Sequence, residues 1–192
     1  MEEGRLQLSD TVESLLPGFT TPDVSVAQGD GFRRVPATRA ITLHDLLTHS
    51  SGLTYGERSA NTPVREAHAR LGIAVNPRAL ATTEFVARLC QAPLVHQPGT
   101  VWEYGLSTDL LGVVVEAVAG QTLGRFLTAR IFEPLGMRDT TFHVDPSRSG
   151  RLAQPFAIDP ATGEALRDPA QTYDASVMPR MESGGAGAVS TA

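Results

Sequence analysis

Residues 97 to 112 read QPGTVWEYGLSTDLLG, a loop with helix-breaking residues that runs directly into a helical pattern. Pro98 and Gly99 interrupt any regular element, and Tyr104 follows shortly after them. From Ser107 onward, apolar residues recur at the spacing of one helix face, and Gly120 stands just past the last of them. We therefore expect a helix that Ser107 caps and Gly120 ends, with Tyr104 held on a rigid mount just before it. The apolar residues of this face are Leu110, Leu111, Val114, Val115 and Val118.

Shorter helices and long loops are expected elsewhere in the chain. Thr42 and Thr122 are suitable N-caps, and Thr82 or Thr83 is expected to cap the run that starts at Glu84. Residues 20–40 contain several glycines and prolines and are expected to hold one short strand, while residues 156–158 and 165–166 flank a turn and suggest a small hairpin. The further helical segments are residues 10–16, 43–49, 65–71, 84–91 and 123–131.

The composition argues against a nucleic-acid-binding protein. The chain has 192 residues, of which 41% are hydrophobic, so it is long and apolar enough for one packed domain. Its net charge is −5, whereas a protein that binds nucleic acid needs a basic face that displaces counterions from phosphates. We therefore expect no nucleic-acid partner. All 16 basic residues are arginine, so the sequence contains no lysine.

Neither a metal site nor a membrane span is expected. The five histidines are scattered, and none belongs to an HExxH motif or a Cys/His cluster. No run approaches the ~20 apolar residues of a membrane helix. The single cysteine, Cys90, lies in an apolar helical run and is interpreted as a small buried hydrophobe. The first residues show no signal peptide, which slightly favours a cytoplasmic location and leaves the compartment open.

Four motifs follow one another along the chain. They are residues 41–53 (ITLHDLLTHSSGL), 97–112, 131–140 (IFEPLGMRDT) and 183–187 (SGGAG). Each motif alone is weak, but in this order and at these separations the chain resembles the class C β-lactamase superfamily of serine hydrolases, with its DD-peptidases and family VIII carboxylesterases. The resemblance covers essentially the whole chain. It implies an α/β serine β-lactamase/DD-peptidase-like fold, represented here mainly by its helical subdomain, with long loops, little sheet and exposed apolar helix surface.

The resemblance also implies an acyl-serine mechanism without a metal or an organic cofactor. In the family, the serine of a Ser-x-x-Lys motif attacks the carbonyl of a small ester or amide. A tyrosine takes the serine proton and later returns it to the leaving group. This tyrosine matches Tyr104, which without its flanking pattern would be interpreted as an ordinary half-buried aromatic residue.

The residues after Tyr104 favour an ester over a β-lactam as the substrate. The lactamase branch has an asparagine two residues after the tyrosine, whereas this sequence has Leu106, which cannot donate a side-chain hydrogen bond. Gly105 and Leu106 are therefore expected to shape the substrate pocket. Gly184 and Gly185 are further candidates, because glycine lets backbone approach a substrate closely, although a plain flexible turn explains them equally well.

Three neighbouring features receive structural interpretations. Trp102 is interpreted as a core or hinge aromatic rather than a residue that stacks on a substrate. Asp109 is interpreted as part of the polar face of its helix or of a local salt bridge. Residues 49–52 lack the Gly-x-Ser-x-Gly pattern of a nucleophile elbow and are interpreted as a cap and turn.

The absence of lysine conflicts with the family's Ser-x-x-Lys motif. Arginine cannot replace the lysine, because its pKa above ~12 keeps it protonated. In the family, the nucleophile precedes a stretch like residues 2–6, and a third motif lies downstream of Gly185. We therefore expect residues 1–192 to be an incomplete β-lactamase-related domain, truncated at both ends and inactive alone. The alternatives are a degenerate, non-catalytic binding module that keeps the substrate cleft and a nonfunctional gene fragment.

Overall fold

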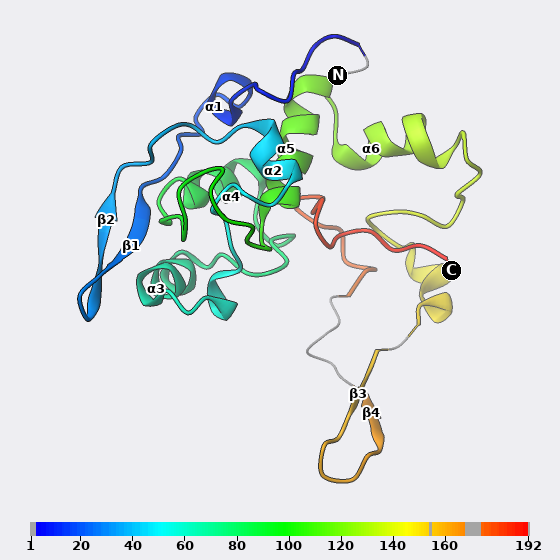
Figure 1. Cartoon of the computed structure of the whole chain (residues 1–192). Coiled ribbons are helices and arrows are strands. Elements are labelled where there is room, and N and C mark those ends of the chain that lie inside the picture. Colours follow the sequence, from blue (N-terminus) through cyan, green and yellow to red (C-terminus); the bar gives the residue numbers. More distant parts are fainter. Residues whose placement is uncertain (1–2, 154, 168–173, 192) are drawn as a thin grey trace.

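The computed structural model describes residues 3–153, 155–167 and 174–191. Helices and loops dominate, and the named strands form two separate antiparallel hairpins, which confirms the expectation of little sheet (Figure 1). The strands are β1 (Val24–Gln28), β2 (Gly31–Val35), β3 (Phe156–Ile158) and β4 (Ala165–Arg167). The helices are α1 (Val12–Leu15), α2 (Leu43–Leu47), α3 (Thr62–Leu71), α4 (Thr82–Leu89), α5 (Ser107–Ala119) and α6 (Leu123–Leu127). The remaining helical elements are the 3₁₀ helices η1 (Gly56–Arg58) and η3 (Pro146–Arg151) and the π-helical η2 (Thr128–Phe132).

Several helix ends follow the local sequence. The Thr42 hydroxyl accepts from the Asp45 backbone N–H, and the Asp45 carboxylate accepts from the Thr42 backbone N–H, so α2 begins with a complete capping box. The Thr122 hydroxyl caps α6 by accepting from the Arg125 backbone N–H. Gly120 ends α5 in the left-handed conformation at φ 66°. These three predicted helix ends are confirmed.

Other predicted element ends are wrong. The N-cap of α5 is Leu106, because the Ser107 hydroxyl is buried and lies 2.9 Å from the Ser51 hydroxyl. The N-cap of α4 is Ala81 rather than Thr82 or Thr83. The apolar stripe over 123–131 is not one α-helix, since α6 passes into the π-helical turn η2 after Leu127.

Residues 20–40 form a strand pair instead of one short strand. β1 and β2 pair in the register Val24↔Val35 to Gln28↔Gly31, and Gly29 enters the turn at φ 56°. Only the start of β1 is buried, while β2 is largely exposed, which explains the weak alternation of its sequence. The hairpin predicted from residues 156–158 and 165–166 is confirmed as β3 and β4.

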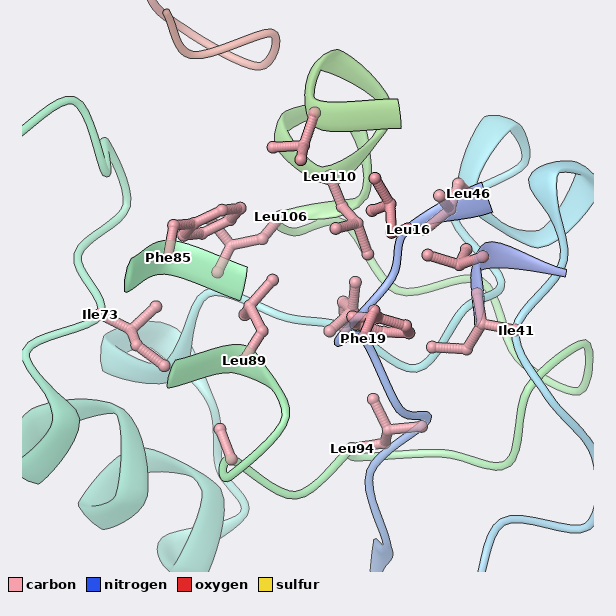
Figure 2. Packing of buried hydrophobic residues seen from close by; sticks show 14 of the residues in the cluster. Leu16, Phe19, Ile41, Leu46, Ile73, Phe85, Leu89, Leu94, Leu106 and Leu110 are labelled. Atoms are coloured by element: carbon pink, nitrogen blue, oxygen red, sulfur yellow. The ribbon is translucent and has the colours of Figure 1, made fainter. Parts of the chain in front are cut away.

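The hydrophobic core gathers around α4 and the start of α5 (Figure 2). Phe85 and Leu89 of α4 and Leu106 and Leu110 at the start of α5 are each 0% exposed. Burying a side chain of this size contributes about 1.5–3 kcal/mol. The core therefore fixes the point where α5 begins, three residues after Tyr104. The other labelled members in Figure 2 are Leu16, Phe19, Ile41, Leu46, Ile73 and Leu94.

The apolar face of α5 extends beyond this core. Val115 and Val118 line an open groove of about 290 Å³ together with Leu6 and Phe126. These four side chains are half-buried, so the exposed apolar helix surface expected from the sequence is only partly present on this side of α5.

Candidate active site

Tyr104 lies at the surface within a group of aromatic rings. Its side chain is 49% exposed, so the ring is not sealed in the core. The Tyr104 ring centroid lies 4.9 Å from that of His49, 5.5 Å from that of Tyr55 and 6.3 Å from that of Trp102. The sequence did not point to Tyr55 or His49 as neighbours of this phenol, because both come from a segment some fifty residues earlier.

A close backbone crossing fixes the position of Tyr104. A Cβ at Gly105 would lie 2.4 Å from Thr54 Cα and 2.7 Å from the Leu53 carbonyl oxygen. Only glycine fits this approach. The next residue, Leu106, is 0% exposed and packs in the core. Tyr104 therefore stands directly before two residues that cannot move without disturbing the packing.

Backbone hydrogen bonds join the segment before Tyr104, residues 94–104, to residues 49–54. The N–H groups of Val95 and Gly99 donate to the carbonyls of Gly52 (3.0 Å) and Ser50 (2.7 Å), respectively. The N–H of Glu103 donates to the His49 carbonyl at 2.8 Å. These bonds hold the backbone next to Tyr104 without help from any particular side chain.

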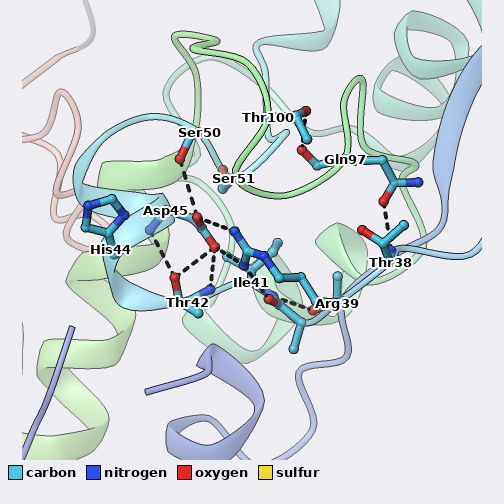
Figure 3. Close-up of polar contacts among 12 residues, drawn as sticks. Thr38, Arg39, Ile41, Thr42, His44, Asp45, Ser50, Ser51, Gln97 and Thr100 are labelled. Atoms are coloured by element: carbon cyan, nitrogen blue, oxygen red, sulfur yellow. Dashed lines mark hydrogen bonds and ion pairs between the residues drawn. The ribbon is translucent and has the colours of Figure 1, made fainter. Parts of the chain in front are cut away.

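Arg39 and Asp45 form an ion pair next to the loop that precedes Tyr104 (Figure 3). The guanidinium donates to both carboxylate oxygens, at 2.6 and 2.9 Å. Burial alone would raise the pKa of Asp45, but hydrogen bonds from Arg39 and Thr42 outweigh it and hold the pKa below its ordinary value. A Cβ at Gly99 would meet Arg39 Nη2 at 2.0 Å, so the loop before Tyr104 rests directly on this ion pair.

Tyr55 is the buried counterpart of Tyr104. It is 5% exposed, and burial is the main cause that raises its pKa to about 12, followed by the charge of Asp109 and by Tyr104. Tyr55 therefore stays protonated at neutral pH. Of these two phenols, Tyr104 is the one that solvent and a ligand can reach.

Asp109 does not lie on the polar face of α5, so that interpretation is wrong. The residue is 1% exposed, and its Oδ1 accepts from the Ser183 hydroxyl and, at 3.3 Å, from the Gly185 N–H. Burial raises the pKa of Asp109, against the lowering effect of these hydrogen bonds. Among the described residues, no donor reaches its Oδ2. Asp109 thus ties the glycine-rich segment to the first turns of α5.

Gly184 and Gly185 lie against this helix rather than beside Tyr104. A Cβ at Gly184 would meet the Thr108 carbonyl oxygen at 2.5 Å, and one at Gly185 would meet Asp109 Oδ2 at 2.6 Å. Both glycines line an apolar groove of about 540 Å³ formed with α5, α6 and Phe142. Of the described residues that line this groove, none belongs to the aromatic group around Tyr104.

The four candidate pocket residues therefore separate into two places. Gly105 packs against the backbone of Leu53 and Thr54, and Leu106 packs in the core with no exposed surface for a ligand. Gly184 and Gly185 reach the groove on α5. Whether any of the four contacts a substrate stays a prediction.

Neither a metal cluster nor a membrane helix is found in the part of the chain that the structure describes. Within it, no group of three or more His, Cys, Asp or Glu side chains could hold a metal ion. No single described helix has the length and apolar character of a membrane span, although Ser107–Ala119 and Leu123–Phe132 meet these criteria together as a pair bent by 77°.

Comparison with known proteins identifies the family. The Beta-lactamase family model matches residues 1–192. The chain belongs to the beta-lactamase family. Among its relatives in this family, Esterase EstB of Burkholderia gladioli is 34% identical over 209 residues, which cover 96% of this chain and 50% of EstB. Protein Rv1367c of Mycobacterium tuberculosis is 36% identical over 160 residues, which cover 83% of this chain and 38% of that protein.

Solved structures of beta-lactamase-like proteins share the fold. Simvastatin synthase (LovD) from Aspergillus terreus matches with a TM-score of 0.79 at 30% identity, over 99% of this chain and 46% of LovD. The hydrolase EstCE1, which has promiscuous acyltransferase activity, matches with a TM-score of 0.75 at 31% identity, over 98% of this chain and 50% of EstCE1. The expected β-lactamase/DD-peptidase-like fold is confirmed. The chain spans half or less of the length of these relatives.

Proposed function

We propose that this chain is part of an acyl-serine enzyme that cleaves small esters, in which Tyr104 carries the proton. The observation that carries the proposal is the exposed phenol of Tyr104 on a rigid backbone crossing, within a family match over the whole chain. Relatives named as esterases support the choice of substrate class: Esterase EstB, and the lovastatin esterase of Penicillium rubens at 35% identity. Leu106 supports it too, because the chain offers no side-chain amide at that position.

In the proposed reaction, Tyr104 is the general base that accepts the proton of a serine hydroxyl while the serine oxygen attacks the ester carbonyl. The tetrahedral intermediate then expels the alcohol, to which Tyr104 returns the proton, and an acyl-serine remains. Water then attacks the acyl-serine carbonyl while Tyr104 takes the water proton. Tyr104 returns this proton to the serine oxygen as the acid is released. Because the sequence has no lysine, we infer that the Ser-x-x-Lys nucleophile belongs to chain outside these 192 residues, so that residues 1–192 form an incomplete domain.

An acceptor alcohol in place of water is the second candidate for the last step. Two relatives from Aspergillus terreus and Penicillium citrinum are named methylbutanoyltransferases, each 33% identical to this chain. In such a reaction the acyl group passes from serine to an alcohol oxygen. Tyr104 would then take the proton of that alcohol instead of a water proton.

A chimeric enzyme tests the role of Tyr104. This chain would replace the matching segment of Esterase EstB, which keeps its own segments on either side, and hydrolysis of p-nitrophenyl butyrate would be followed. We expect turnover in the chimera and a loss of about 10²–10⁴-fold in Tyr104→Phe, the size of a general acid–base contribution. Full turnover in Tyr104→Phe would contradict the proposal.

The 192-residue chain alone serves as the second arm of this experiment. We expect no ester turnover from it, because the nucleophile is absent. Turnover from the isolated chain would show that one of its own serines acts as nucleophile. A cooperative thermal transition of the isolated chain would distinguish a domain that folds, including a non-catalytic binding module, from a fragment that does not.

A further inference from the structure

Trp102 is not a core residue, so the core part of that interpretation is wrong, while a role at a hinge stays a prediction. Its indole is 66% exposed, which is unusual for so large an apolar side chain. It stacks on Tyr104 with ring centroids 6.3 Å apart and an interplanar angle of 22°. The His49 ring meets Trp102 edge-on at 6.4 Å and 60°. We call His49, Trp102 and Tyr104 the aromatic platform.

Hydrogen bonds of Glu103 hold the aromatic platform in place. The Glu103 N–H donates to the His49 carbonyl at 2.8 Å, and the Thr54 hydroxyl donates to the Glu103 carboxylate at 2.7 Å. Glu103, which lies between Trp102 and Tyr104, is therefore fixed by both its backbone and its side chain. Rings fixed before binding lose little conformational freedom when a ligand arrives.

Backbone strain at His49 belongs to the same arrangement. His49 has φ 53° and is, among the described residues, the one non-glycine with positive φ. Such conformations persist where the surroundings impose them, and they cluster at functional sites. Here the conformation brings the imidazole against both Trp102 and Tyr104. The Glu103 carboxylate between them is directed to Thr54, whose hydroxyl donates to it, so the platform offers a ligand ring faces, which suit an apolar planar ring.

We propose that the aromatic platform is a binding subsite for a neutral planar ring, carried on the acyl or alcohol side of an ester, with Trp102 as the specificity-determining residue. This proposal rests on the proposed function, because the ester carbonyl would then lie next to the Tyr104 phenol. A planar ring would continue the near-parallel stack of Tyr104 and Trp102, whereas a saturated ring of the same size would lose this contact.

The test uses the 192-residue chain and needs no turnover. Trp102 is the only tryptophan, so its indole N–H gives one resolved signal in a ¹H–¹⁵N spectrum. We expect methyl benzoate to shift this signal saturably with a dissociation constant of about millimolar size. Methyl cyclohexanecarboxylate should bind about two- to tenfold more weakly, the range expected for one aromatic pair.

Variants decide whether Trp102 carries the binding. In ligand-observed saturation-transfer spectra, Trp102→Ala should weaken methyl benzoate by about two- to tenfold, and Trp102→Phe should retain most of the affinity. Phe156→Ala is the matched control, because Phe156 is also an exposed aromatic (59%) but lies on β3. We expect no change in this variant.

On a chain whose thermal transition is cooperative, three results would overturn the subsite: no saturable shift, equal affinity for the planar and saturated esters, or equal weakening in Trp102→Ala and Phe156→Ala. Failure of the proposed function is read separately, from the EstB chimera. A chimera that needs Tyr104 while methyl benzoate fails to bind would leave the proposed function intact and remove the subsite. An inactive chimera, together with methyl benzoate binding that depends on Trp102, would remove the proposed function and leave the binding of a planar ring intact.

Discussion

Replacing Ser183 with alanine tests the contact that ties the glycine-rich segment to α5. The Ser183 hydroxyl donates to Oδ1 of Asp109, and each of the two residues is 1% exposed. The substitution leaves the Gly185 N–H, at 3.3 Å, as the remaining described donor to this oxygen. Because a hydrogen bond to a charged group contributes about 1.5–3 kcal/mol, we expect the free energy of unfolding to fall by about 2 kcal/mol.

This loss should depend on pH. Burial raises the pKa of Asp109, so between the ordinary value of about 3.9 and the folded value the native state binds more protons than the unfolded chain. Stability therefore falls as pH rises through that window. Without the Ser183 hydroxyl the folded pKa rises further and the window extends upward. Ser183→Ala should consequently lose more stability at pH 8 than at pH 5.

Urea unfolding at both pH values measures the effect. With a slope of about 2 kcal/mol/M, the expected loss corresponds to a midpoint lowered by about 1 M. Ser147→Ala is the matched control, since Ser147 also donates its hydroxyl to an aspartate, Asp145, but at an exposed site. We expect its stability to stay within about 0.5 kcal/mol. Equal midpoints for wild type and Ser183→Ala at pH 8, or an equally large shift in the control, would refute the reasoning.

Two further substitutions test the packing around the site. Gly105→Ala should cost about 1–3 kcal/mol in a thermal or urea melt and lower turnover in the EstB chimera, because its Cβ would lie 2.4 Å from Thr54 Cα. Gly150→Ala, with no atom within 4 Å of its Cβ, should change neither stability nor turnover. Equal effects in the two variants would contradict the close backbone approach at Gly105. Burial lowers the pKa of His68 to about 4, so the folded state binds fewer protons than the unfolded chain between pH 4 and about 6.5, and stability should fall as pH decreases through that range. His68→Leu should flatten this slope in urea titrations while the exposed His44→Asn should not, and an unchanged slope in His68→Leu would count against the burial of a neutral imidazole.

Patterns that are local in the sequence predicted local structure well. The Thr42 capping box, the Gly120 helix end and the β3–β4 hairpin each depend on residues a few positions apart, and all three are confirmed. The family resemblance, carried by four motifs in order, predicted the fold that the solved relatives share.

Contacts between distant segments account for the errors. Ser107 has the side chain of an N-cap, but a buried hydroxyl of Ser51 takes its hydrogen bond. Asp109 lies on a helix with an amphipathic sequence, yet the distant Ser183 covers it and donates a hydrogen bond to its carboxylate. Tyr55 and His49 join Tyr104 only because Gly105 lets two backbones cross, and nothing near Tyr104 in the sequence encodes which residues lie on the other side.

The backbone seam between residues 49–54 and 94–104 has a consequence for how this surface can vary. Its amide-to-carbonyl bonds do not depend on which side chains the seam carries, apart from the positions where glycine is required, Gly52 and Gly99. Side chains that project from it, such as Val101 and Trp102, are therefore free to change without altering the frame that carries the phenol. New preferences for a bound ring could arise here by single substitutions, while the acid–base group keeps its place.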